Sequence, residues 1–144
     1  RWPLWLLVAL SLVTVWRLPG EYRYQLFYNA RTERSPLATL EMMADDAARR
    51  LPWSPYPCEQ LGKEALSRQR FDLAERCFRE AIVRTPHRAA FHAYLAQALA
   101  YQGRFKEAVP AAEEAVFWYP HKGEYQQLLA ALKAAAANQS GPLP

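Results

Sequence analysis

Histidine, cysteine and paired carboxylate side chains are the groups in this chain that could perform catalysis or bind a metal. The three histidines occur singly and form no zinc-binding or nucleophile motif with their neighbours. Cys58 and Cys77 form no CxxC pair and have no histidine at metal-ligand spacing. Asp45 and Asp46 are adjacent, so in a helix they point about 100° apart, which suits solvent rather than joint acid–base work. We therefore predict that the protein is not an enzyme and that it has no catalytic residue, no metal site and no cofactor.

Charge is mild and spread along the chain. Eighteen Lys and Arg residues stand against fourteen Asp and Glu residues, which gives a net charge of +4 for 144 residues. Nucleic-acid binding needs basic side chains gathered on one face, and phosphate binding is typically signalled by a glycine-rich motif. Because the sequence shows neither, it predicts no nucleic acid and no small-molecule substrate among the partners.

Residues 2–16 form an uncharged apolar segment with a tryptophan at each end, as is typical of segments that cross a bilayer. Fifteen residues span only about 22 Å of a hydrocarbon core of roughly 30 Å, so Arg17 would have to snorkel or the bilayer to thin. We predict a hydrophobic anchor or assembly helix over residues 1–19, a transmembrane helix in contact with the membrane through residues 2–18. The alternatives are a signal peptide, a helix buried against copies of itself and an ordinary core helix. The side chains expected to carry the anchor role are Trp2, Trp5, Leu6, Leu10 and Trp16.

Residues 20–36 form an aromatic-rich bridge in which rings alternate with charges. The composition predicts a helix over 20–34, which Pro19-Gly20 and Ser35-Pro36 should separate from its neighbours. We interpret the rings as an interfacial belt near lipid headgroups, with a protein interaction surface as the alternative. These rings belong to Tyr22, Tyr24, Phe27 and Tyr28.

A period of 34 residues is the strongest pattern in the chain. Small residues let antiparallel helices approach closely, larger side chains fill the space between them, and proline ends the second helix of each unit. This pattern resembles the tetratricopeptide repeat family, whose unit of 34 residues is a helix–turn–helix. The positions that carry it are Leu61, Gly62, Phe71, Ala74, Phe78, Ala81 and Pro86, followed by Leu95, Ala96, Phe105, Ala108, Ala112, Ala115 and Pro120.

The resemblance implies an all-α fold, with an N-terminal hydrophobic helix followed by a short tetratricopeptide α-solenoid of antiparallel helix pairs. Such units bury their apolar faces only by stacking, so this array is near the lower size limit. The predicted repeat domain covers 37–137 and divides into a half-repeat at 37–54, complete repeats at 55–88 and 89–122, and a closing helix at 123–137, before a tail at 138–144.

Several positions depart from the family pattern. Cys58 and His92 stand where the family has a large aromatic residue, and Gln69 stands where Gly103 turns the second repeat. We expect looser local packing and an unchanged fold. Because Cys58 and Cys77 fall on the two helices of one repeat, the sequence allows either a disulfide or two buried thiols.

In the tetratricopeptide family, the first helices of the repeats line a groove that holds peptides or partner helices. Carried onto this chain, the resemblance predicts partner contacts by Tyr56, Glu59, Lys63, Leu66, Gln97 and Tyr101. We predict a non-catalytic structural or scaffold protein, fixed by its hydrophobic helix, that binds protein partners or copies of itself.

We expect the protein to be membrane-anchored, with its repeats in the periplasm or outside the cell; the cytoplasmic side is the alternative. Two further hypotheses stay open at this point. One is a subunit of a homopolymeric extracellular filament with a pilin-like layout, and the other is the periplasmic repeat tail of an O-antigen ligase-like membrane enzyme.

Overall fold

The computed structural model describes residues 19–31 and 35–138, and every regular element in these ranges is helical. Residues 19–31 form a helix that we term the leading helix. The all-α prediction is confirmed for the described residues. The helices that follow are α2 (Leu37–Arg50), α3 (Tyr56–Ser67), α4 (Phe71–Arg84), α5 (Ala89–Tyr101), α6 (Phe105–Trp118) and α7 (Gly123–Asn138).

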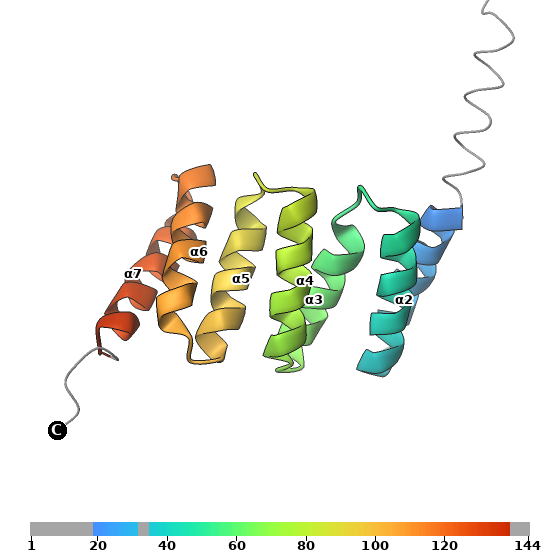
Figure 1. Cartoon of the computed structure of the whole chain (residues 1–144), viewed down its shortest axis with the longest axis horizontal. Coiled ribbons are helices and arrows are strands. Elements are labelled where there is room, and N and C mark those ends of the chain that lie inside the picture. The colour runs from blue at the N-terminus through green and yellow to red at the C-terminus, as the bar shows by residue number, and fades with distance from the viewer. Residues whose placement is uncertain (1–18, 32–34, 139–144) are drawn as a thin grey trace, which may run out of the picture.

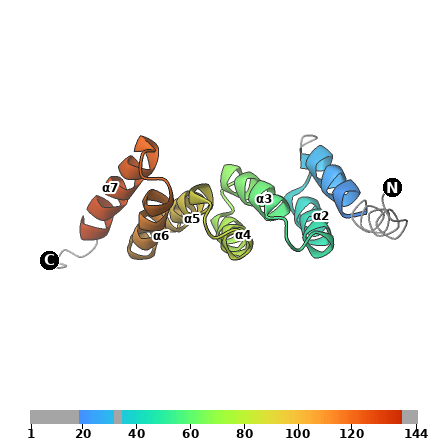
Figure 2. The same cartoon turned by 90° about the horizontal axis from the view of Figure 1, so that it is seen from above.

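Consecutive helices run in opposite directions and follow one another along the long axis of the molecule (Figure 1). Seen from above, they alternate between two layers, with the leading helix, α3, α5 and α7 in one layer and α2, α4 and α6 in the other (Figure 2). Each helix packs mainly against its neighbours in sequence, which is the arrangement of an α-solenoid. The predicted solenoid of antiparallel helix pairs is therefore confirmed.

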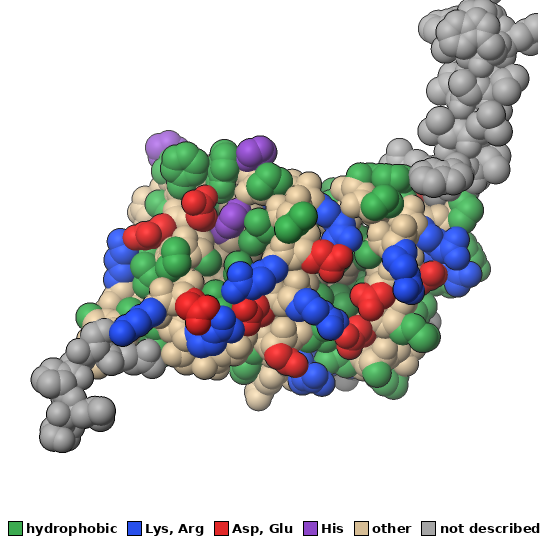
Figure 3. Space-filling model, viewed as in Figure 1, with side chains coloured by type: hydrophobic (Ala, Val, Ile, Leu, Met, Phe, Trp, Pro, Cys, Tyr) green, Lys and Arg blue, Asp and Glu red, His purple; other side chains and the backbone are tan. Residues whose placement is uncertain are grey.

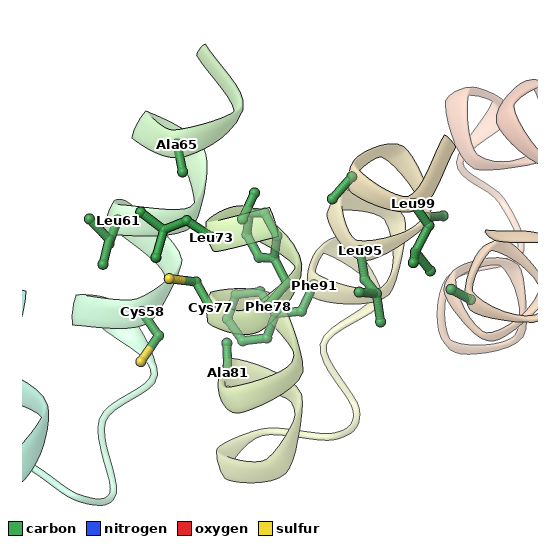
Figure 4. Packing of buried hydrophobic residues seen from close by; sticks show 14 of the residues in the cluster. Cys58, Leu61, Ala65, Leu73, Cys77, Phe78, Ala81, Phe91, Leu95 and Leu99 are labelled. Carbon is green, nitrogen blue, oxygen red and sulfur yellow. The ribbon is translucent and has the colours of Figure 1, made fainter. Parts of the chain in front are cut away.

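Small residues set the close approach of the helices. Gly62 on α3 faces the fully buried ring of Phe78 on α4, and a Cβ atom at Gly62 would lie 2.8 Å from Phe78 Cζ. Figure 4 shows this ring among buried side chains of α3, α4 and α5. Alanines without exposed surface fill the matching contacts along the array: Ala74, Ala81, Ala96, Ala108, Ala112 and Ala115.

One turn joins the two helices of each complete repeat, and the two turns are equivalent. Gln69 and Gly103 occupy the same repeat position and have φ angles of 60° and 76°. Each turn is closed by the same backbone bond, from Arg70 N to Ala65 O at 2.8 Å and from Arg104 N to Leu99 O at 3.0 Å. The turn geometry therefore survives the replacement of glycine by glutamine, although glutamine adopts the left-handed region at a cost.

The leading helix completes the first helix pair of the array. Phe27 is fully buried in the core, and it precedes Leu61 by the same 34 residues that separate Leu61 from Leu95. Arg23 Nε also lies 3.5 Å from Asp46 Oδ2 on α2. The helix expected in the bridge is present, but the interfacial-belt interpretation is wrong for Phe27, because that ring packs inside the protein.

Pro19-Gly20 was expected to separate the anchor from the helix of the bridge. Both residues lie within the leading helix, and the residues before them lie outside the described ranges. Gly20 packs against Leu51 so closely that a Cβ atom would come within 2.7 Å of Leu51 Cδ2. The glycine therefore serves close packing here.

The predicted anchor over 2–18 and the tail beyond residue 138 lie outside the described residues. Within 19–31 and 35–138, no helix combines the length and the apolar character needed to cross a bilayer.

The two cysteines are buried as free thiols, so the alternative of a disulfide is wrong. Burial raises the pKa of the Cys58 thiol to about 11. Burial also raises the pKa of the Cys77 thiol, with the nearby Cys58 acting in the same direction. Both thiols are therefore protonated at neutral pH and pack as small apolar groups.

Candidate protein-binding surfaces

Cations and aromatic rings meet on the surface of the leading helix, α3 and α5, which we term the α3–α5 face. Lys63 Nζ lies 5.3 Å from the centre of the Tyr94 ring. The guanidinium carbon of Arg88 lies 5.8 Å from the centre of the Tyr56 ring. A cation is attracted to the face of an aromatic ring, so these contacts position long side chains that would otherwise move freely.

Glu59 lies beneath these cations, with only 3% of its surface exposed. Lys63 Nζ donates to Glu59 Oε1 at 2.6 Å, and Arg88 Nη1 lies 3.3 Å from Glu59 Oε2. A buried carboxylate needs such counter-charges, because its desolvation is costly. Glu59, predicted as a partner contact, is therefore placed as an internal counter-charge that holds Lys63 and Arg88.

A groove of about 590 Å³ lies where the turn between α3 and α4 meets α5. Tyr101, whose surface is 65% exposed, forms one wall and stacks on Phe71 with ring centres 4.9 Å apart. Leu66, Gln97 and Tyr101, all predicted from the sequence, therefore share one site. Its lining consists of Leu66, Ser67, Gln69, Phe71, Gln97 and Tyr101.

A second groove, of about 470 Å³, lies between the leading helix and the start of α3. Tyr56 lines it together with Tyr24, and the two rings lie 6.4 Å apart. The structure thus divides the predicted contacts between two grooves, with Lys63 on α3 between them. The second groove is lined by Glu21, Tyr24, Leu51, Trp53, Ser54, Pro55 and Tyr56.

Arg31, Arg88 and Tyr94 also lie on this face and were not among the predicted contacts, whereas Tyr24 was predicted only under the alternative of an interaction surface in the bridge. Arg31 Nη1 donates to Gln60 Oε1 at 2.8 Å and so ties the leading helix to α3. Extending the 34-residue register backward from Leu61 to Phe27 would have placed Tyr24 and Arg31 on a first helix of the array. Arg88 lies in a loop, and nothing in the repeat pattern points to its contact with Glu59.

A separate network of charges joins α4 to the turn between α5 and α6. Arg104 Nη1 lies 2.7 Å from Glu75 Oε2, and Gln102 Nε2 donates to the same oxygen at 3.0 Å. Burial acts to raise the pKa of Glu75, but hydrogen bonds from Gln102 and Arg79 and the charge of Arg104 outweigh it and hold the pKa below its ordinary value. This network binds two repeats together.

A third groove, of about 750 Å³, runs between α4 and α6 with α5 as its floor. Ile82 and Val83 form one wall, and Pro110 lies in the other. No sequence pattern singled out this groove, because it lies on the side of the second helices.

The described residues offer these three grooves and no cluster of metal-binding side chains. In the ranges that the structure covers, no group of three His, Cys, Asp or Glu side chains could hold a metal ion. The exposed rings and the positioned cations of the α3–α5 face instead suit the binding of a polypeptide segment.

Residues 60–127 match the tetratricopeptide repeat family. No curated protein sequence matches the chain.

Solved structures of repeat proteins resemble the whole array at low sequence identity. The MamA RS-1 ArsTM double mutant is 17% identical with a TM-score of 0.71, and the match covers 82% of this chain and 66% of that one. The type III secretion chaperone SycD of Yersinia enterocolitica, in complex with a peptide of the translocator YopD, is 17% identical with a TM-score of 0.63, over 80% of this chain and 87% of that one.

The first repeat domain of Spaghetti (RPAP3), bound to the HSP90 peptide SRMEEVD, is 14% identical with a TM-score of 0.64, over 86% of this chain and 92% of that one. At such identities the likeness shows the fold alone, and this chain spans less than two thirds of the MamA structure named above. The matched repeats and the shared fold together support a tetratricopeptide repeat protein.

Proposed function

We propose that this protein is a non-catalytic scaffold that binds an extended or helical segment of a protein partner, or of another copy of itself, across the α3–α5 face. The observation that carries the proposal is the groove beside Tyr101, where an exposed ring stacks on Phe71 and is thereby held ready for contact. A ring that is already ordered loses little conformational entropy on binding.

The charge of the α3–α5 face specifies the partner further. Lys63, Arg88 and Arg31 lie on this face, whereas Glu59 is buried and paired with two of these cations. Glu21 is the exposed acid of the second groove, so the two grooves and the residues between them present three cations against this one exposed carboxylate. We infer that the bound segment carries an apolar side chain for the Tyr101 groove and at least one carboxylate for the cations.

Two proteins of the same fold support this use of the array. SycD was solved in complex with a peptide of YopD, and the Spaghetti domain was solved bound to an HSP90 peptide. These neighbours show that a helical array of similar length can hold a short peptide.

Membrane attachment through residues 2–18 is the second part of the proposal. It is supported by the sequence, because fifteen consecutive uncharged residues end in tryptophan on both sides. The attachment would hold the binding face near a bilayer, with the repeat domain in the periplasm or outside the cell.

Display of random peptides on phage, selected against the purified chain, tests the binding role. Selected peptides should be rich in acidic and apolar residues, and their Kd should rise about tenfold or more for Tyr101→Ala and for Lys63→Ala. Met42→Ala is the matched control, since this side chain is exposed on α2, away from the face. Peptides whose Kd is unchanged by both face substitutions would contradict the proposed site.

A further inference from the structure

The three loops between repeats lie along one edge of the array and share a motif. The loops before α3, α5 and α7 all lie at the upper edge in Figure 1. At the same repeat position each exposes a proline followed by an aromatic or imidazole ring. These pairs are Pro52-Trp53, Pro86-His87 and Pro120-His121.

Apolar side chains at the ends of α4 and α6 widen this motif into a ridge, which we term the loop ridge. Val83 and Phe117 occupy equivalent positions and are 83% and 72% exposed. The His87 ring packs edge-on against Trp118 at 4.4 Å, and Trp118 packs on Phe117 at 5.0 Å. Figure 3 shows hydrophobic and histidine side chains gathered at this edge. Large exposed apolar surfaces of this kind mark places of contact.

Three backbone carbonyls of the loop ridge already have hydrogen-bond partners within the chain. The carbonyl oxygens of the three loop prolines accept hydrogen bonds from Arg84, His92 and Gln126, at 3.0, 2.7 and 2.7 Å. Transfer of a carbonyl group from water to an apolar environment costs free energy if the carbonyl has no hydrogen-bond partner there. These bonds therefore allow the ridge to enter a less polar environment.

The start of the leading helix points to what covers the ridge. Gly20 packs on Leu51, and Glu21 shares a groove with Trp53, so the helix begins beside the first loop of the ridge. The sequence that precedes it is the uncharged, tryptophan-flanked segment 2–16. Trp and Tyr side chains favour the boundary between headgroups and hydrocarbon, where an apolar ring and a polar group are both accommodated.

We propose that the loop ridge rests on the surface of a lipid bilayer, with the rings of Trp53, Phe117 and Trp118 at the headgroup boundary. Three loops in a row form an extended line, which fits a plane better than it fits a short peptide. The contact is made mainly by rings, because two cations of this edge are paired within the chain, Arg84 with Glu80 at 2.7 Å and Lys122 with Glu124 at 3.1 Å. That the ridge faces a bilayer rests on the membrane attachment of residues 2–18 proposed above.

Fluorescence quenching on vesicles tests this placement with the full chain. A polarity-sensitive dye is attached to His121→Cys on the ridge or, as matched control, to Lys106→Cys at the start of α6 on the opposite edge. The native thiols are buried and compete little for the dye. In phosphatidylcholine vesicles with spin-labelled headgroups, the dye at 121 should be quenched severalfold more than the dye at 106. This difference should persist in about 1 M salt, where charge attraction is screened beyond about 3 Å.

A second variant and a flotation assay separate the possible failures. Val83→Ser with Phe117→Ser should abolish the extra quenching at 121, while circular dichroism shows an intact array, because both side chains are exposed. A chain that floats with the vesicles but is quenched equally at both positions would overturn the ridge contact and leave the attachment of 2–18 standing. A chain that does not float would overturn both.

Discussion

The imidazole Nε2 of His92 lies 2.7 Å from the carbonyl oxygen of Pro86 and closes the loop that leads into α5. A carbonyl only accepts hydrogen bonds, so Nε2 must carry the hydrogen. In the next repeat, Gln126 stands at the same position and donates to Pro120 O at 2.7 Å. The first repeat has Cys58 there, and Arg84 takes over by donating to Pro52 O at 3.0 Å. The equivalent proline carbonyl is therefore hydrogen-bonded by a different side chain in each of the three loops.

Replacement of His92 by glutamine should preserve this bond, whereas replacement by leucine should break it. We expect His92→Leu to lower the free energy of unfolding by about 1 kcal/mol, because the Pro86 carbonyl loses its donor. His92→Gln should change it by less than half as much. Urea unfolding followed by circular dichroism measures both, and equal losses would show that the ring rather than the bond matters.

Gln69→Gly should stabilise the protein by about 0.5–1 kcal/mol. Gln69 has a φ of 60°, and a non-glycine residue pays for that conformation. The reciprocal change, Gly103→Gln, should destabilise by a similar amount, since Gly103 has a φ of 76° with free space around it. Thermal melts of the two variants should shift in opposite directions, and a shift in the same direction would refute the account.

Gly62→Ala should destabilise the protein by about 1–3 kcal/mol, although alanine favours helices. The added Cβ would lie 2.8 Å from Phe78 Cζ, and that ring is fully buried. Gly123→Ala is the control, because a Cβ there meets nothing within 4 Å. Its unfolding free energy should stay unchanged or rise slightly.

Glu75→Gln should lower stability at neutral pH by about 1 kcal/mol and should reduce the loss of stability in acid. The hydrogen-bonded carboxylate has a lowered pKa in the folded protein. Its contribution is therefore present above the ordinary glutamate pKa of about 4.3 and is lost as the pH falls through the lower, folded pKa. Unfolding at pH 7 and pH 3 measures the effect. Glu113→Gln, which breaks a more exposed pair with Lys133, should change little at either pH.

Cys58 and Cys77 should react slowly with a thiol reagent in the folded protein at pH 7 and rapidly in denaturant. Burial raises both pKa values, to about 11 for Cys58, so little thiolate forms. Ser67→Cys, at an exposed position, gives the rate expected of an accessible thiol. Native thiols that reacted as fast as this control would contradict their burial.

The solenoid was predictable because its information is local and repeated. A proline at Pro86 and Pro120, and small residues such as Gly62, each have a geometric reason at one point of every unit. The leading helix was harder to place, since only Phe27 shows its register and the rings around it are also typical of an interfacial segment.

On the proposed binding face, the contacts between side chains were less predictable from the sequence than the helices that carry them. The repeat pattern puts Glu59 on the correct helix but says nothing of Arg88, which reaches it from a loop. Burial of a carboxylate depends on counter-charges from two other places in the chain, and such coincidences in space leave no periodic trace in the sequence.

Phe78 links the proposed binding face of α3 and α5 to the interior of the protein. Its ring packs against Gly62 and also stacks on Tyr94, with centres 5.1 Å apart, and Lys63 Nζ lies 5.3 Å from the centre of the Tyr94 ring. A polypeptide that bound as proposed and displaced Lys63 would therefore act, through two stacked rings, on the close contact between α3 and α4. Under the proposed function, the choice of partner and thermal stability would therefore constrain each other, and a change of specificity at Lys63 would require repacking between α3 and α4.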